Sequence, residues 1–205
     1  MAAVRRVRRQ TTTVSNSRIA SGQAAAPAEP RIRPGAPGDA AVLAAFAARS
    51  FSDAFGRDNR PEDLAAHLAS SYGVPQQSRE LADPRYVTLL AEQGTTLAGY
   101  AQVRRQAPPP CVTGATPIEL YRFYVDGTWH GRGVSQALME AVRSAAAGMG
   151  GETIWLSVWE KNPRARAFYA KCGFQDVGTT DFHVGPDRQT DRVLVASLAG
   201  APEKP

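Results

Sequence analysis

Hydrophobic and polar positions follow two different periods along this chain, and each change of period marks an expected element. "RIR" reads as a short strand, and the Ala-rich segment opened by Gly38 and Asp39 reads as a helix to about Ser52. "RPEDLAAHLAS" predicts a second helix, because Pro61 stands in its first turn and two acidic residues follow, as the helix dipole favours.

The middle of the chain changes to the period of strands. "YVTLLAEQGTTLAGYAQVRRQ" predicts a hairpin around Gly94, "APPPCVTGATP" predicts a loop, and the apolar "IELYRFYV" predicts a strand inside a sheet. The helical period returns after Gly133 and should end at the glycines between positions 148 and 151.

The last third repeats the strand and helix order. "TIWLSVWE" predicts a strand, and "NPRARAFYAKCGF" predicts a helix capped by Asn162, with Pro163 first and Gly173 at its end. Two final strands, "FQDVGTTDFHV" and "DRVLVASL", flank a predicted turn, "GPDRQT". The order β-α-α-β-β-β-α-β-α-β-β indicates an α/β (α+β) class.

Length and charge narrow the class of protein. The 205 residues suffice for one domain, and apolar runs such as "AAVLAAFAA" fall short of the roughly 18 residues of a membrane span, so no membrane partner is expected.

The net charge of +5 lies in residues 1–28, which hold five arginines and no acidic residue; the rest of the chain balances 19 basic against 19 acidic residues. We therefore expect no nucleic-acid partner. We predict a disordered basic leader over 1–29, the folded domain over 30–199 and a flexible tail over 200–205.

The two cysteines, Cys111 and Cys172, cannot build a disulfide framework and lack metal-ligand spacing. We expect a cytoplasmic location and no metal.

The stretch "WHGRGVSQALMEAV" places two glycines and a serine at a helix start, where bare amides and the helix dipole attract an anion. A P-loop would need Lys and Ser/Thr after Gly133, but Val134 and Ser135 follow. A Rossmann fingerprint would need a third glycine and an acidic residue about 20 positions further on, and the chain does not supply this combination. Both nucleotide-binding motifs are therefore excluded, and the stretch indicates a phosphate-binding site of another class.

These residues resemble the GNAT (Gcn5-related N-acetyltransferase) family from about residue 31 to 198. Its phosphate loop is Q/R-x-x-G-x-G/A, and this chain has "HGRGVS", so His130 and Ser135 depart from the pattern. Its second block, N-x-x-A-x-x-F-Y-x-x-x-G-F, is matched at each fixed position by "NPRARAFYAKCGF".

The resemblance implies a mixed, mostly antiparallel sheet of six to seven strands, with splayed central strands and about four flanking helices. It also implies acetyl-CoA as co-substrate, held by backbone groups of one splayed strand and by amides of the phosphate loop. The residues expected to bind it are Phe123, Tyr124, Val125, His130, Gly131, Arg132, Gly133, Val134, Ser135, Asn162, Ala165, Phe168 and Tyr169.

The same resemblance assigns the acid and the base. Tyr169 is expected to protonate the leaving thiolate, and Asn162 lies seven residues earlier on the same helix face. Glu119 is the expected base, 14 residues before Gly133, and strand alternation would place it on one face with Tyr121, Phe123 and Val125. The alternatives are a helix cap for Asn162 and a core position for Tyr169. For Glu119 they are a solvated strand face or an ion pair, either with Arg122 or with a neighbouring strand, while a water chain serves as base.

The C-terminal third, with "LSVWEKN" and "QTD", is similar to the PaiA-type branch of spermidine/spermine N-acetyltransferases, which implies a small amine such as a polyamine as acceptor. Alternatives are a protein N-terminus or lysine, and a non-catalytic acetyl-CoA-binding module. Family members often dimerise, so a homodimer is one further expectation. The carboxylates that could line a polycation slot are Glu119, Asp126, Asp181, Asp187 and Asp191.

Overall fold

The computed structural model describes residues 29–184 and 187–198. The predicted leader, apart from Glu29, and the predicted tail lie outside these residues. So do the first two positions of the predicted turn "GPDRQT". The other four positions, Asp187 to Thr190, belong to the last strand, which pairs with its neighbour from Asp187 onward, so these four are strand and not turn.

Within the described residues, seven strands form one sheet in the order β1-β2-β3-β4-β5-β7-β6. Neighbouring strands are antiparallel except for β4 and β5, which are parallel. This confirms the predicted mixed, mostly antiparallel sheet. The strands are β1 (Arg31–Pro34), β2 (Tyr86–Gln93), β3 (Thr96–Arg104), β4 (Pro117–Val125), β5 (Thr153–Trp159), β6 (Gln175–Val184) and β7 (Asp187–Ser197).

The helices lie where the period of 3.6 residues predicts them, with one addition. A short helix after Gly73 was not expected from the sequence; it begins with Pro75 in its first turn. The helices are α1 (Ala40–Phe55), α2 (Pro61–Tyr72), α3 (Val74–Ala82), α4 (Val134–Gly148) and α5 (Pro163–Lys171), with short 3-10 turns η1 (Pro37–Asp39) and η2 (Gly127–Trp129).

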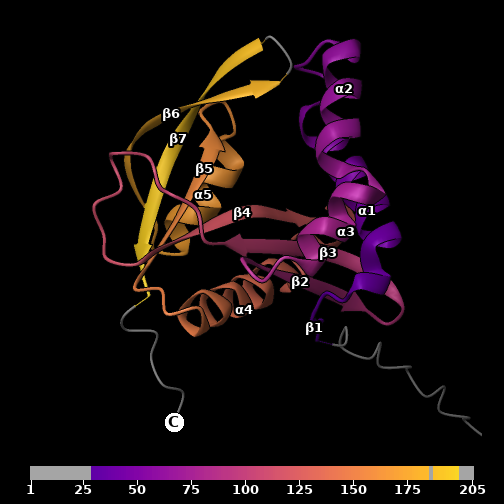
Figure 1. Ribbon diagram of the computed structural model, residues 1–205, viewed down its shortest axis with the longest axis horizontal. Coiled ribbons are helices and arrows are strands. Elements are labelled where there is room, and N and C mark those ends of the chain that lie inside the picture. The colour runs from indigo at the N-terminus through magenta and orange to yellow at the C-terminus, as the bar shows by residue number, and fades with distance from the viewer. Residues whose placement is uncertain (1–28, 185–186, 199–205) are drawn as a thin grey trace, which may run out of the picture.

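The helices cover the sheet on two sides. One core lies under α4 and α5 and includes Leu138, Val142 and Tyr169, and the other lies under α1 to α3 and includes Phe46 and Tyr100. Figure 1 shows α1 to α3 gathered on one side and α4 beneath β2 to β4, while β5, β6 and β7 turn steeply away from those strands. The sheet therefore opens in its middle, between β4 and β5.

Candidate active site

The opening begins where β4 and β5 stop pairing. Their parallel register covers only Pro117 to Glu119 against Thr153 to Trp155, although both strands continue. The amide of Asp126 donates to Ala98 on β3, and backbone groups alternate in direction along a strand. The backbone groups of Phe123 and Val125 therefore face the opening. This confirms the expected splay of the central strands and leaves the inner edge of β4 free of a strand partner.

The phosphate-loop glycines take the backbone conformation that explains their presence. Gly131 has φ of 74° and Gly133 has φ of 84°, in the left-handed region that favours glycine, and Gly133 is the N-cap of α4. A Cβ at either position would meet no atom within 4 Å, so the conformation and not crowding requires glycine.

The amides in front of α4 divide into two groups. Those of His130 and Arg132 donate back to the carbonyls of Gly127 and Trp129, both at 3.3 Å. The others have no hydrogen-bond acceptor in the part of the chain described, and they point to an anion site at the helix dipole. These unpaired amides belong to Gly131, Gly133, Val134 and Ser135.

The side chain of His130 has a role that the sequence did not indicate. Its Nε2 lies 2.9 Å from the carbonyl oxygen of Val125. Because a carbonyl only accepts, Nε2 is the protonated nitrogen. The imidazole thus ties the phosphate loop to the end of β4, in place of the Gln or Arg of the family pattern.

Helix α5 carries the second block. Asn162 caps the helix, since its Oδ1 accepts from the amide of Ala165 at 3.0 Å. The helix-cap alternative is therefore confirmed. It occupies only Oδ1, and the Nδ2 group has no hydrogen-bond partner among the described residues.

Tyr169 is buried among aromatic rings. Its ring lies 6.3 Å from that of Phe123, 5.5 Å from Phe168 and 5.6 Å from Phe174, measured between centroids. Burial raises the pKa of its hydroxyl well above the ordinary value, so the group keeps its proton at neutral pH. In the described chain the hydroxyl has no partner, yet it is not among the fully enclosed unpaired atoms.

A bulge in β4 corrects the predicted face of this strand. Gln102 lies opposite Arg122, but the next residue of β3 lies opposite Leu120, so Tyr121 is an extra residue. Alternation shifts by one across the bulge. Phe123 and Val125 consequently pack with the core under α4, not on the face of Glu119, and the prediction of one shared face is wrong.

Glu119 is buried and paired. Arg104 on the neighbouring strand β3 donates from Nε to its Oε2 at 2.5 Å, which confirms the alternative of an ion pair with a neighbouring strand. Its other oxygen, Oε1, has no partner in the described chain. Glu119 also lines a cavity of about 410 Å³ beneath the loop at 106–110. Other polar or aromatic residues of the cavity wall are Arg104, Trp155, Ser157, Thr180 and Asp181.

The remaining candidate carboxylates are dispersed. Asp126 caps η2 through Thr128, and Asp187 accepts from Gln189 at 2.8 Å. Asp191 is buried and does not line the cavity, but Ser157, which does, donates to its Oδ2 at 2.9 Å. Only part of the expected slot is therefore assembled in one place.

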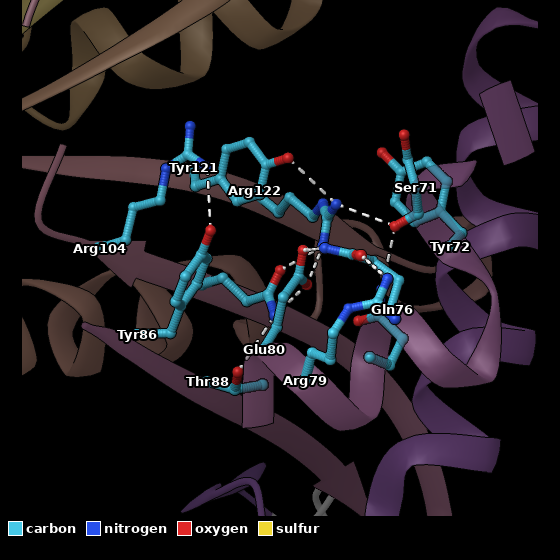
Figure 2. A network of polar contacts seen from close by, with 12 residues as sticks. Ser71, Tyr72, Gln76, Arg79, Glu80, Tyr86, Thr88, Arg104, Tyr121 and Arg122 are labelled. Carbon is cyan, nitrogen blue, oxygen red and sulfur yellow. Dashed lines mark hydrogen bonds and ion pairs between the residues drawn. The ribbon is translucent and has the colours of Figure 1, made fainter. Parts of the chain in front are cut away.

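Arg122 forms a buried network that sequence reasoning missed. Figure 2 shows its guanidinium between α3 and β4: Nη1 donates to Glu80 at 2.5 Å and to Gln102 at 2.7 Å. It also lies over the rings of Tyr72 and Tyr121 at 4.7 and 4.4 Å. An arginine inside an apolar strand was the available signal, because a buried charge requires a partner from elsewhere in the fold.

The described part of the chain contains neither a membrane-spanning helix nor a cluster of metal-binding side chains. None of its helices combines the length and the apolarity that crossing a bilayer requires. Residues 29–184 and 187–198 also contain no group of three or more His, Cys, Asp or Glu side chains placed to hold a metal ion. Both cysteines are free.

Comparison with known proteins finds a matching family model, relatives in sequence and a solved structure with a similar fold. The family model described as acetyltransferase (GNAT) family matches residues 49–174. An uncharacterized N-acetyltransferase of Mycobacterium tuberculosis (strain ATCC 25618 / H37Rv) is 36% identical over 160 residues, which cover 78% of this chain and 98% of the relative. The aminoglycoside N(6')-acetyltransferase type 1 of Stenotrophomonas maltophilia is 28% identical over 72% of this chain and 87% of its own. The solved structure of the PaiA N-acetyltransferase of Thermoplasma acidophilum with coenzyme A has a TM-score of 0.67 at 18% identity, over 83% of this chain and 99% of that one. The last likeness establishes a shared fold.

Proposed function

Because the chain belongs to the GNAT family of acetyltransferases, we propose that it transfers an acetyl group from acetyl-CoA to the primary amine of a small cationic acceptor, with a polyamine as first candidate. The observation that carries the proposal is the free inner edge of β4, which runs from the cavity beside Glu119 to the unpaired amides in front of α4.

The fit to acetyl-CoA rests on this chain's own donors. The unpaired amides of Gly131, Gly133, Val134 and Ser135 offer four donors for a pyrophosphate. The inner edge of β4 at Phe123 to Val125, with Phe168 and the Nδ2 group of Asn162, would hold the pantetheine arm. The thioester supplies the acetyl group and a thiol leaving group. His130 already hydrogen-bonds the Val125 carbonyl, so the backbone groups left for the arm are those of Phe123 and the amide of Val125.

We propose Tyr169 as the general acid. A general acid must carry a proton at working pH, and the raised pKa of this hydroxyl ensures that. Its lack of a hydrogen-bond partner among the described residues leaves it free to donate to the departing sulfur. The aromatic ring of Phe123 connects it to the strand that would hold the thioester.

The acceptor class follows from the cavity. Glu119 and Asp181 bring two carboxylates to its wall; Arg104 pairs with the first and Arg188 with the second, but Oε1 of Glu119 stays free to accept a hydrogen bond from an ammonium group. A volume of about 410 Å³ suits one arm of a small molecule. We therefore assign Glu119 to binding the acceptor's ammonium group, and its role as base stays a prediction.

The decisive experiment follows CoA release with a thiol reagent, using acetyl-CoA and spermidine, spermine, simple alkylamines, aminoglycosides and short peptides. Saturable release with a small amine supports the proposal. Release with peptides alone would replace it with protein acetylation, and tight acetyl-CoA binding without release across the panel would replace it with a non-catalytic binding module.

A further inference from the structure

Asp191 is a buried carboxylate without a compensating charge. Only 6% of the residue is exposed, and in the described chain no lysine or arginine pairs with it. Its one hydrogen bond comes from the hydroxyl of Ser157, 2.9 Å from Oδ2. Burial raises the pKa of Asp191 to about 6, and the negative charge of Glu160 adds to the effect. Such a group gains from any nearby proton or cation.

Ser157 connects this carboxylate to the cavity. Asp191 lies opposite Trp159 on β5 and opposite Thr180 on β6, so its side chain shares a face with Ser157, two residues before Trp159. Ser157 and Thr180 line the cavity, whereas Asp191 is not one of the lining residues. The hydroxyl of Ser157 therefore links the cavity wall to the carboxylate through its hydrogen bond.

The same wall contains a buried donor that lacks a partner. Trp155 lines the cavity and is only 4% exposed, yet its indole Nε1 has no hydrogen-bond partner among the described residues. Since buried donors are nearly always hydrogen-bonded, this indole N–H is a second incompletely satisfied polar group on the sheet face that carries Asp191.

Among the carboxylates in and beside the cavity wall, Asp191 is the one that has no cationic partner in the described chain. Oε2 of Glu119 is held by Arg104 at 2.5 Å, and Asp181 is paired with Arg188 at 2.9 Å. Arg192, next in the chain to Asp191, points to the other face and pairs with Asp176. Glu160 at the end of β5 is the charge that acts on Asp191 itself.

We infer that Ser157 and Asp191 form the route by which the acceptor's ammonium group loses its proton before attack, an inference that rests on the proposed function. An N–H proton of the ammonium passes to Oγ of Ser157 while the Ser157 O–H proton passes to Oδ2 of Asp191. The products are a neutral amine and a protonated Asp191 carboxyl, and the hydroxyl of Ser157 is regenerated. No other reactant is needed.

The test compares the pH profile of kcat/KM for the best acceptor of the amine panel. With an internal base, the wild-type profile should be flat from about pH 6.5 to the pKa of the amine. Asp191→Asn and Ser157→Ala can react only with the fraction of acceptor that is already free amine, so their kcat/KM should rise about tenfold per pH unit, from roughly 1,000-fold below wild type at pH 7 to near wild type at pH 10. Ser157→Thr restores the hydroxyl and should restore the flat profile.

Two further variants separate this role from others. Asp176→Asn makes the same change on the opposite face and should keep the wild-type profile. Glu119→Gln should raise the KM for the acceptor while the flat profile persists. If Glu119→Gln acquires the tenfold slope and Asp191→Asn keeps the flat profile, Asp191 is not the base and the inference is overturned.

A readout without turnover complements the kinetics. The ¹³C signal of the Asp191 carboxyl should titrate near pH 6 in the wild-type protein and shift its midpoint in Ser157→Ala; a midpoint near 4 in both would overturn the inference. An active wild type with an unaltered Asp191→Asn profile contradicts only this inference, whereas a wild type inactive on every amine contradicts the proposed function.

Discussion

At the scale of single residues, the proposed site depends on titratable side chains whose protonation state is set by their burial. Burial keeps the Tyr169 hydroxyl protonated and makes Asp191 a stronger base than an exposed aspartate. The two lie on different elements, α5 and β7. The proposed acid and the inferred base would thus hold opposite protonation states at neutral pH.

The Asp191 carboxylate should lower stability above its pKa. Its folded-state pKa of about 6 exceeds the ordinary 3.8, so the folded state favours the protonated form, and this stabilisation is lost as pH rises from about 4 through 6. Asp191→Asn is neutral throughout and should raise the free energy of unfolding by about 2 kcal/mol at pH 7.5 but hardly at pH 4. Urea unfolding at both pH values measures this; an equal gain at both would refute the charge explanation. A variant that is more stable and less active is the expected combination.

Tyr169→Phe should separate chemistry from binding. Loss of the proton donor should lower kcat by about 100-fold, while the dissociation constant for acetyl-CoA stays within about twofold, because the ring remains. Tyr100→Phe is the matched control, since it removes a buried hydroxyl that lacks a partner in the described chain and lies in the other core. CoA release and calorimetric titration measure the two quantities. Equal kcat in wild type and Tyr169→Phe would remove Tyr169 from the mechanism.

At the scale of elements, the sequence predicted those with strong local signals. The capped helix at Asn162 and the glycine turn before α4 were both predictable, because caps and positive φ angles depend on a few adjacent residues. The bulge at Tyr121 was not, since it is set by pairing with β3, and it reversed the faces of Phe123 and Val125. The Ser157 and Asp191 pair also depends on strands distant in sequence.

Gly133→Ala should weaken cofactor binding and stability together. A non-glycine residue at φ of 84° costs about 1–2 kcal/mol, or else the loop moves and its amides lose their alignment. We expect the KM for acetyl-CoA to rise about tenfold and the urea midpoint to fall. Gly148→Ala at the other end of α4 meets no atom within 4 Å and should leave the KM unchanged. An unaltered KM in Gly133→Ala would argue against the loop as the pyrophosphate site.

At the scale of the whole molecule, one buried network joins the acceptor-side helices to the sheet. Arg122 donates to Glu80 on α3 and to the Ser71 carbonyl on α2, and it follows the bulge in β4 (Figure 2). Its guanidinium and that of Arg104 lie over the same Tyr121 ring, and Arg104 holds Glu119. The position of Glu119 is therefore linked by contacts to the helices that cover the other core.

Removing one charge of this buried network should lower the free energy of unfolding more than removing one charge of an exposed ion pair. Glu80→Gln keeps the side-chain volume but leaves the Arg122 guanidinium buried without its counter-charge, so the free energy of unfolding should fall by about 3–5 kcal/mol. Glu62→Gln makes the same change in the exposed pair with Arg60 and should have little measurable effect. Urea unfolding measures both changes in stability.

In the folded fraction, Glu80→Gln should also raise the KM for the acceptor, because Arg122 and Tyr121 support Arg104 beside Glu119, while the KM for acetyl-CoA should not change. A loss confined to stability would mean that the network holds the fold together without positioning the acceptor site.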